Sequence, residues 1–177
     1  MTWWTEGPSI ENECCRKETG RVRREKIVTY SLWAASILWM GFCLFLSWQT
    51  GEDTADLSEG VTQTVKQIIH LFGVEVDLNT LHTWLRKSAH IVTFFVSGTL
   101  LCCSFARSLK RRPHGGLLSF SLSAALCCVC AIAAEVCKVW IPGRHLQWDE
   151  TGWNVIGAIC GAGIACAFGY LRGLRRK

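Results

Sequence analysis

Four long stretches without a formal charge constrain the fold of this chain more than any other feature of its sequence. They cover residues 27–48, 88–106, 113–134 and 151–171, and they hold 22, 19, 22 and 21 residues. A helix rises about 1.5 Å per residue, so about 20 residues cross a hydrocarbon core of about 30 Å. Helices of soluble proteins usually keep a polar stripe, which makes four buried soluble helices the weaker interpretation. We therefore expect an all-α fold, an integral membrane bundle of four transmembrane helices.

The ends of these stretches divide the chain into three parts. Residues 1–26 form a basic tail, residues 27–172 the membrane domain, and residues 173–177 a basic C-terminus. The first stretch is longer than the apolar core of a signal peptide, and no small-x-small cleavage site follows it. We therefore expect it to remain in the protein as a signal anchor.

The basic residues predict the orientation of the bundle, because Lys and Arg near membrane ends favour the cytoplasm. The N-terminal tail holds six of them, the connection 107–112 holds four and residues 172–177 hold four, together 14 of the 19 in the chain. The connection 49–87 has only three, against six acids. We expect both termini inside (N-in/C-in), and the first and third connections outside. The net charge of +5 is then an orientation signal, and we expect no nucleic-acid partner.

Eleven Cys do not predict a disulfide framework here, because most of them lie inside the apolar stretches. Cys14 and Cys15 lie in the tail that we place in the reducing cytoplasm. Cys127 and Cys130 form a CxxC, but within a lipid-buried stretch and with no His or acidic partner nearby. We interpret the cysteines as small packing residues, and we expect neither a metal site nor a cofactor.

The long outer connection contains an amphipathic helical pattern. Apolar residues recur there at steps of three and four: Leu57, Val61, Val65, Ile68, Ile69 and Phe72. Thr54 or Asp56 is suited to cap this helix, and Gly73 ends it. A second short helix begins near Asp77 or Asn79 and runs into the second transmembrane helix. The first helix is expected on the outer leaflet or over the bundle mouth, as a plain spacer or as a lid.

Polar residues near the outer ends of three helices form the candidate site. They are, in chain order, Arg86, Lys87, His90, Glu135, Lys138, Arg144, Glu150 and Asn154. Arg144 lies in the third connection. On the helices, His90 follows Arg86 and Lys87 by four and three positions, and the pairs Glu135–Lys138 and Glu150–Asn154 are three and four positions apart, so each group can share one helix face. Helical rise places His90, Glu135 and Asn154 about 5 to 8 Å below the outer helix ends, in one layer of the leaflet. Trp140, Trp148 and Trp153 suit the aromatic belt at the interface.

Two interpretations of this site stay open. In the structural one, Glu135 pairs with Arg86 or Arg144, and the remaining basic side chains extend to lipid headgroups. In the functional one, an anionic phosphate or carboxylate is bound by Arg86, Lys87, Lys138, Arg144, Glu150 and Asn154. His90 and Glu135 are then the candidate catalytic residues, because they can move protons. No nucleophile is singled out, so the reaction type and the existence of an enzymatic activity stay open.

The fourth stretch carries a pattern of small residues. Every fourth position is small, at Gly157, Gly161, Ala165, Gly169 and Gly173. Such a stripe allows another helix to approach closely. We interpret it as a packing surface.

These motifs resemble those of the VanZ-like family of bacterial membrane proteins. The family's R-K-x-x-H motif is matched by Arg86, Lys87 and His90. Its E-x-x-Q-x-(aromatic)-x-P-G-R motif is matched by Glu135 and residues 140–144. Two further segments match, namely 45–52 after the first helix, and Asn154, Gly157 and Gly161 in the Gly-rich last helix. The resemblance covers roughly residues 27–172.

The chain departs from the family pattern at two positions. Lys138 stands where the family usually has Gln, and Glu150 stands where it usually has Asp, with Asp149 just before it. The additional cation of Lys138 either tightens anion binding or pairs with Glu135.

The resemblance implies a multi-pass cell-envelope protein of the bacterial plasma membrane. The family's founding member is linked to low-level resistance to teicoplanin, a glycopeptide antibiotic that acts outside the membrane. We expect an outward-facing polar site for an anionic lipid or lipid-linked wall precursor. The partners under consideration are membrane lipids, such a precursor or a glycopeptide, and a second copy of the chain. The alternatives are an enzyme acting on a phosphate- or ester-containing lipid headgroup, and a small lipid transporter or flippase, for which four helices are few.

Overall fold

The computed structural model describes residues 10–48, 60–68, 70, 77–110, 112–141 and 147–174. Its four long helices are α1 (Ile10–Ser47), α3 (Leu78–Ser108), α4 (Gly115–Lys138) and α5 (Trp148–Leu174). A shorter helical segment covers residues 60–68. The expected all-α fold is confirmed. Four segments are long and apolar enough to cross a membrane, namely Glu18–Ser47, Leu78–Ser108, Gly115–Lys138 and Trp148–Arg172.

Two of the helices begin well before the uncharged stretches that predicted them. α1 begins at Ile10, inside the basic tail, and α3 begins at Leu78 rather than Ser88. Neither added segment contains Pro, and the one in α1 is rich in Glu, Lys and Arg, which are good helix formers. The uncharged stretches therefore mark the apolar part of each helix and not its ends.

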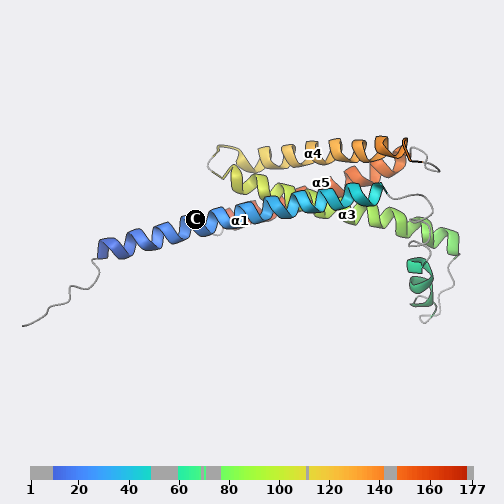
Figure 1. Ribbon diagram of the computed structural model, residues 1–177, viewed down its shortest axis with the longest axis horizontal. Helices are drawn as coiled ribbons and strands as arrows, with labels where there is room; N and C mark the ends of the chain where they lie inside the picture. Colours follow the sequence, from blue (N-terminus) through green and yellow to red (C-terminus); the bar gives the residue numbers. More distant parts are fainter. Residues whose placement is uncertain are drawn as a thin grey trace, which may run out of the picture.

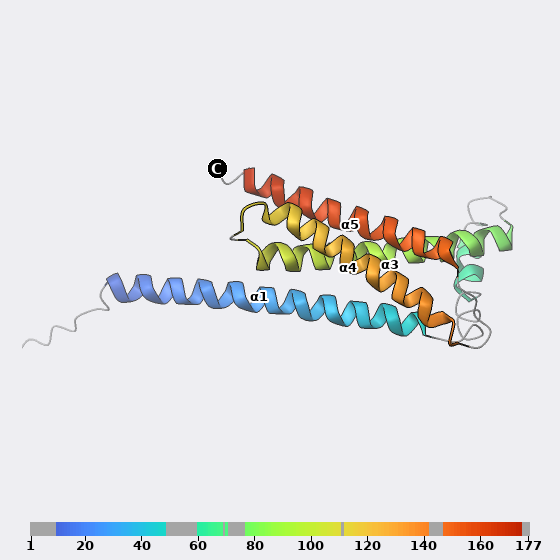
Figure 2. The ribbon, with the colours of Figure 1, turned by 90° about the horizontal axis from the view of Figure 1, so that it is seen from above.

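The long helices run side by side with alternating direction (Figures 1 and 2). α3 contacts all three of the others, and its contact with α5 is the most extensive in the bundle. The start of α1, the connection from α3 to α4 and the C-terminus lie at one end of the bundle. The ends of α1 and α4 and the starts of α3 and α5 lie at the other, which we call the site end.

The backbones of α3 and α5 touch where α5 carries small residues. A Cβ added to Gly157 would overlap the carbonyl oxygen of Ile91, and one added to Gly161 would overlap that of Phe95. Gly98 of α3 meets the backbone of Ala158 in the same way. The predicted packing role is confirmed for Gly157 and Gly161.

At Gly169 the small stripe leaves this contact. A Cβ on Gly169 would meet open space, so the packing prediction is wrong at that position. A helix has 3.6 residues per turn, so a strict four-residue repeat turns about 40° further around the axis at each step. Farther from the site end α5 also contacts α4, and there the Cys166 thiol donates a hydrogen bond to the Gly116 carbonyl oxygen at 3.5 Å.

The interior is built mainly from small and apolar side chains. The buried cluster comprises Phe94, Leu101, Cys127, Ala131 and Ala158. Cys43 and Cys102 are also buried and unpaired, in agreement with the packing interpretation, whereas Cys160 is exposed. Large apolar side chains such as Leu38, Val129 and Ile164 point outward instead, which is the pattern of a bundle surrounded by lipid.

Hydrogen bonds hold α1 against α3. The Trp39 indole N–H donates to the backbone oxygen of Thr93 at 3.1 Å. The hydroxyls of Ser36 and Ser104 lie 3.0 Å apart and are both buried. Such bonds between helices act as polar contacts inside an apolar environment.

The first connection is described only in part. Residues 60–68 are helical, as expected, but Thr54, Asp56 and Gly73 lie outside the described residues. Val61 and Ile68, expected on the apolar face, are about half exposed at 54% and 51%, and Thr62 is the buried residue of this segment.

The expected start of α3 is confirmed. Asp77 is its N-cap, and Asp77 Oδ2 accepts hydrogen bonds from the backbone N–H and the hydroxyl of Thr80, each at 3.1 Å. These bonds favour the ionised carboxylate and lower the pKa of Asp77 below its usual value.

Exposed tryptophans mark the level of the site end. Trp48, Trp140 and Trp148 lie at or just beyond the ends of α1, α4 and α5 there, and Trp84 lies in the second turn of α3. Trp favours the boundary between hydrocarbon and headgroups. Trp153 was expected in the same belt but is only partly exposed. Lys87 covers it, with Nζ of Lys87 5.6 Å from the centroid of the Trp153 ring.

Candidate functional site

The predicted polar residues meet at the site end, between α3, α4 and α5. α3 contributes Arg86, Lys87 and His90 from its third and fourth turns, and α4 contributes residues 135 and 138 from its last turn. α5 contributes residues 150 and 154 from its first two turns. Arg144 lies outside the described residues. The others form the network of contacts described next, apart from Lys87, which packs on Trp153.

Lys138 is the deepest cation of this network. It is 4% exposed, and its Nζ lies 2.5 Å from Glu135 Oε1 and 2.5 Å from Glu150 Oε2. The first contact lies within α4, and the second joins α4 to α5. An ammonium shared by two carboxylates offsets part of the desolvation cost of all three groups.

Glu150 is the centre of the network. Besides Lys138 it contacts Arg86, whose Nη2 lies 2.6 Å from Glu150 Oε1, and His90, whose Nε2 lies 3.4 Å from Glu150 Oε2. Of the two residues expected as alternative partners of Glu135, Arg86 pairs with Glu150, and Arg144 lies outside the described residues. Lys138, three residues further along α4, supplies the cation that pairs with Glu135. Arg86 therefore pairs with Glu150 of α5.

His90 is held by two residues of α5. Its Nδ1 lies 3.0 Å from Asn154 Oδ1, and its Nε2 faces Glu150 as stated. Asn154 is 2% exposed, so this hydrogen bond satisfies a buried amide. The i,i+4 spacing of Glu150 and Asn154 is what allows both to reach one imidazole.

Gln147 belongs to the site and was not predicted from the sequence. Its side-chain oxygen accepts a hydrogen bond from Arg86 Nη2 at 3.5 Å, and its backbone N–H donates to Glu135 Oε2 at 3.3 Å. Its position, one residue before α5, carries no periodic signal. The hydrogen bond from the Gln147 backbone to Glu135 depends on how the start of α5 is placed against the end of α4. Local sequence patterns do not determine that placement.

The ion pairs of the network are balanced in charge. Glu135 and Glu150 supply two negative charges, and Lys138 and Arg86 supply two positive ones. A charged group at membrane depth needs such partners to remain ionised. The structural interpretation therefore accounts for these four residues.

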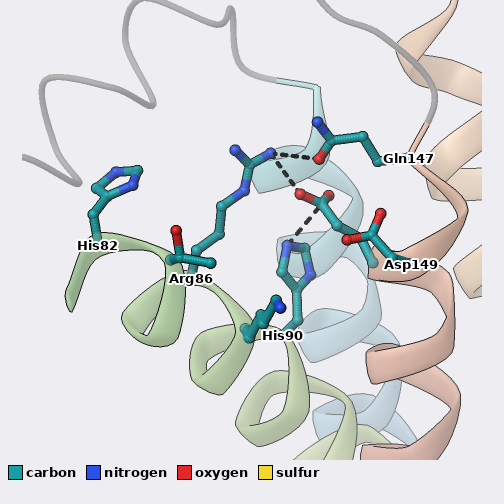
Figure 3. Close-up of a pocket in the computed structure, with 8 residues that line it drawn as sticks. His82, Arg86, His90, Gln147 and Asp149 are labelled. Carbon is teal, nitrogen blue, oxygen red and sulfur yellow. Dashed lines mark hydrogen bonds and ion pairs between the residues drawn. The ribbon is translucent and has the colours of Figure 1, made fainter. Parts of the chain in front are cut away.

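A cleft of about 140 Å³ opens above the network (Figure 3). Its lining residues are His82, Thr83, Arg86, Lys87, His90, Gln147, Asp149 and Glu150. Glu135, Lys138 and Asn154 do not line it. The structure thus separates the predicted residues into a buried set and a set that can touch a ligand.

Comparison with known proteins adds one match. The family model described as VanZ/LLP1 matches residues 32–169, and this range contains every candidate site residue. No curated protein and no solved structure matches the chain.

Proposed function

The chain belongs to the VanZ/LLP1 family, and from this premise we propose that its cleft binds the phosphate-bearing headgroup of an anionic lipid or of a lipid-linked cell-wall precursor. The proposal concerns a multi-pass membrane protein whose site end faces outward. Its support is the cleft itself, which combines cationic side chains with a position at the level where lipid headgroups lie.

The tryptophans support this level. Four exposed Trp side chains surround the site end, and Trp prefers the headgroup boundary. The cleft opens among the same helix ends. A phosphate at the membrane surface is therefore at the right depth to enter it without crossing the hydrocarbon.

The single observation that carries the proposal is the geometry of Arg86. Its side chain is 44% exposed, and both of its contacts in the described part of the chain use Nη2. Figure 3 shows the other terminal nitrogen pointing away from Glu150 and Gln147. Nη1 and Nε are therefore left to donate to a ligand, and a guanidinium held in place by a carboxylate is well suited to bind phosphate. Lys87 adds a second cation to the same lining.

The enzymatic alternative has weaker support from the geometry. Both ring nitrogens of His90 face an oxygen of α5, and Glu135 is bonded by Lys138 and by the Gln147 backbone. A general base needs an atom within reach of the substrate proton. Glu135 does not line the cleft and is 1% exposed, so binding is favoured over catalysis.

The proposed cellular role follows from the proposed orientation. With both termini cytoplasmic, the cleft faces the outer leaflet of the bacterial plasma membrane. Glycopeptides of the teicoplanin type and their wall-precursor targets meet the membrane on that side. We propose that binding of the precursor's phosphate in the cleft contributes to resistance by changing access of the drug to its target.

Lipid retention by the full chain tests the binding proposal. The delipidated protein in detergent is mixed with phosphatidylglycerol or with diacylglycerol, which lacks the phosphate, and bound lipid is counted by native mass spectrometry. We expect retention of phosphatidylglycerol only, and binding weaker by about tenfold in Arg86→Gln, because a charged hydrogen bond contributes about 1.5–3 kcal/mol. Equal retention of the two lipids by the wild type overturns the proposal.

Two variants distinguish binding at the cleft from a general effect of the protein's positive charge. Lys87→Gln removes a cation that forms no ion pair among the described residues, so the buried network stays intact. Lys110→Gln removes an exposed cation from the opposite end of the bundle. We expect weaker binding in the first and unchanged binding in the second. An equal loss in both contradicts a site at the cleft.

A further inference from the structure

We propose that the headgroup bound in the cleft carries an ammonium as well as a phosphate, and that Asp149 binds the ammonium. This inference rests on the proposed function and adds the chemical class of the ligand. The charges of the cleft lining support it, because a simple anion would leave one carboxylate of this lining without a partner of opposite sign.

The lining holds as many formal negative charges as positive ones. Its cations are Arg86 and Lys87, and its carboxylates are Asp149 and Glu150. Glu150 is already engaged by Arg86 and Lys138. An added phosphate would therefore meet Lys87 and the free edge of Arg86, but also the negative charge of Asp149. A ligand with charges of both signs is complementary to this arrangement, because each of its charged groups meets one of opposite sign.

Of the two carboxylates that line the cleft, Asp149 is the one available to a ligand. It is exposed, it lies in the first turn of α5, and within the described part of the chain it forms no ion pair. The dipole of α5 stabilises a negative charge at that position. Asp149 lines the cleft, and Figure 3 shows it on the α5 side, near Gln147.

Lys87 and Asp149 stand on two different walls of the cleft. Lys87 belongs to α3 and packs on Trp153, and Asp149 belongs to α5. They do not pair with each other, since no ion pair joins them although both line the same cleft. One cation and one carboxylate are thus held apart, and a headgroup with a phosphate at one end and an ammonium at the other can contact both.

Two kinds of lipid carry this pair of charges. One is a glycerophospholipid with an ethanolamine headgroup, and the other is a lipid-linked wall precursor whose stem peptide has a free amino group. Acetylation of the amine removes the positive charge in either case and leaves the phosphate unchanged. The acetylated lipid is therefore the matched control for each source.

The test compares these lipids on the full wild-type chain by native mass spectrometry. Phosphatidylethanolamine and its N-acetyl derivative form one pair, and a polyprenyl-diphosphate muropeptide with a free or an acetylated amine forms the other. We expect acetylation to weaken binding about fivefold in at least one pair, the size of an ion pair with an exposed carboxylate. The pair that responds identifies the source of the ligand.

Asp149→Asn assigns the effect to the residue. In this variant the amine and its acetylated form bind equally, whereas in Glu18→Gln, which changes an exposed acid of α1, the wild-type preference remains. Equal binding of amine and acetylated lipids by the wild type overturns the inference, and so does an unchanged preference in Asp149→Asn. If the acetylated lipids still bind better than diacylglycerol, the phosphate site stands without the ammonium. If none of these lipids binds better than diacylglycerol, the proposed function fails as well.

Discussion

Lys138 joins two helices through Glu150, its ammonium lying 2.5 Å from a carboxylate twelve residues further along the chain. The same ammonium contacts Glu135 within its own helix. One buried cation thereby fixes the end of α4 against the start of α5, directly beneath the cleft. We expect the stability of this end of the bundle to depend on that ammonium.

Replacing Lys138 by Met tests this dependence. Among the described Lys and Arg residues, the variant leaves Glu135 without a partner and Glu150 with Arg86 alone. Breaking a buried pair costs about 3–5 kcal/mol. We expect a large loss of stability in detergent unfolding. Lys110→Met is the control, because Lys110 and Glu25 form an exposed pair at 3.4 Å, worth at most about 1 kcal/mol. Equal stability of the two variants would show that the buried network does not hold the site end together.

The contact of α3 and α5 predicts a difference between two glycines of one helix. Gly161→Leu places a side chain against the Phe95 carbonyl, and overpacking costs about 1–3 kcal/mol. Gly169→Leu places it in open space. We expect the first variant to lose thermal stability in detergent and the second to match the wild type. Matching melting curves for both would mean that α3 and α5 do not meet at Gly161.

The proposed orientation predicts which engineered cysteines react from outside. In a cysteine-depleted background, Lys66→Cys in the first connection is expected to react with a membrane-impermeant thiol reagent in intact cells. Lys110→Cys is expected to react only after the cells are permeabilised. Both positions are exposed, so access depends on the side of the membrane and not on burial. The reverse pattern would place the cleft on the cytoplasmic face.

The variant His90→Ala tests whether His90 contributes to ligand binding or only to the stability of the bundle. His90 touches Glu150 and Asn154, but Glu150 keeps Arg86 and Lys138 without it. We expect His90→Ala to cost about 1–3 kcal/mol, the effect of leaving the Asn154 amide unpaired, and therefore to reach the membrane in a folded state.

The measurement is the teicoplanin susceptibility of a bacterium that expresses the protein. Under the proposed function the wild type and Lys110→Gln raise the inhibitory concentration, and His90→Ala and Lys87→Gln do not. A wild-type level of resistance in a folded Lys87→Gln variant would separate resistance from the cleft.

The sequence predicted the helices better than it predicted which side chains of the site pair with one another. Four spans, the start of α3 at Asp77 and the small residues at Gly157 and Gly161 all follow from local patterns, and the structure bears them out. The pairing within the site depends on the register between helices, and the periodicity of a single helix does not predict that register. Arg86 therefore could not be assigned to Glu150 from the sequence, and Gln147 gave no signal at all.

The main-chain contact between α3 and α5 also affects ligand binding. Gly157 and Gly161 leave no side-chain layer that could be compressed, so these helices cannot approach further or slide without a backbone clash. The backbones of α3 and α5, which carry Lys87 and Asp149, are therefore held in a fixed relative position before any ligand arrives. Under the proposed function, the entropy of ordering these backbones is lost during folding and not when a headgroup binds.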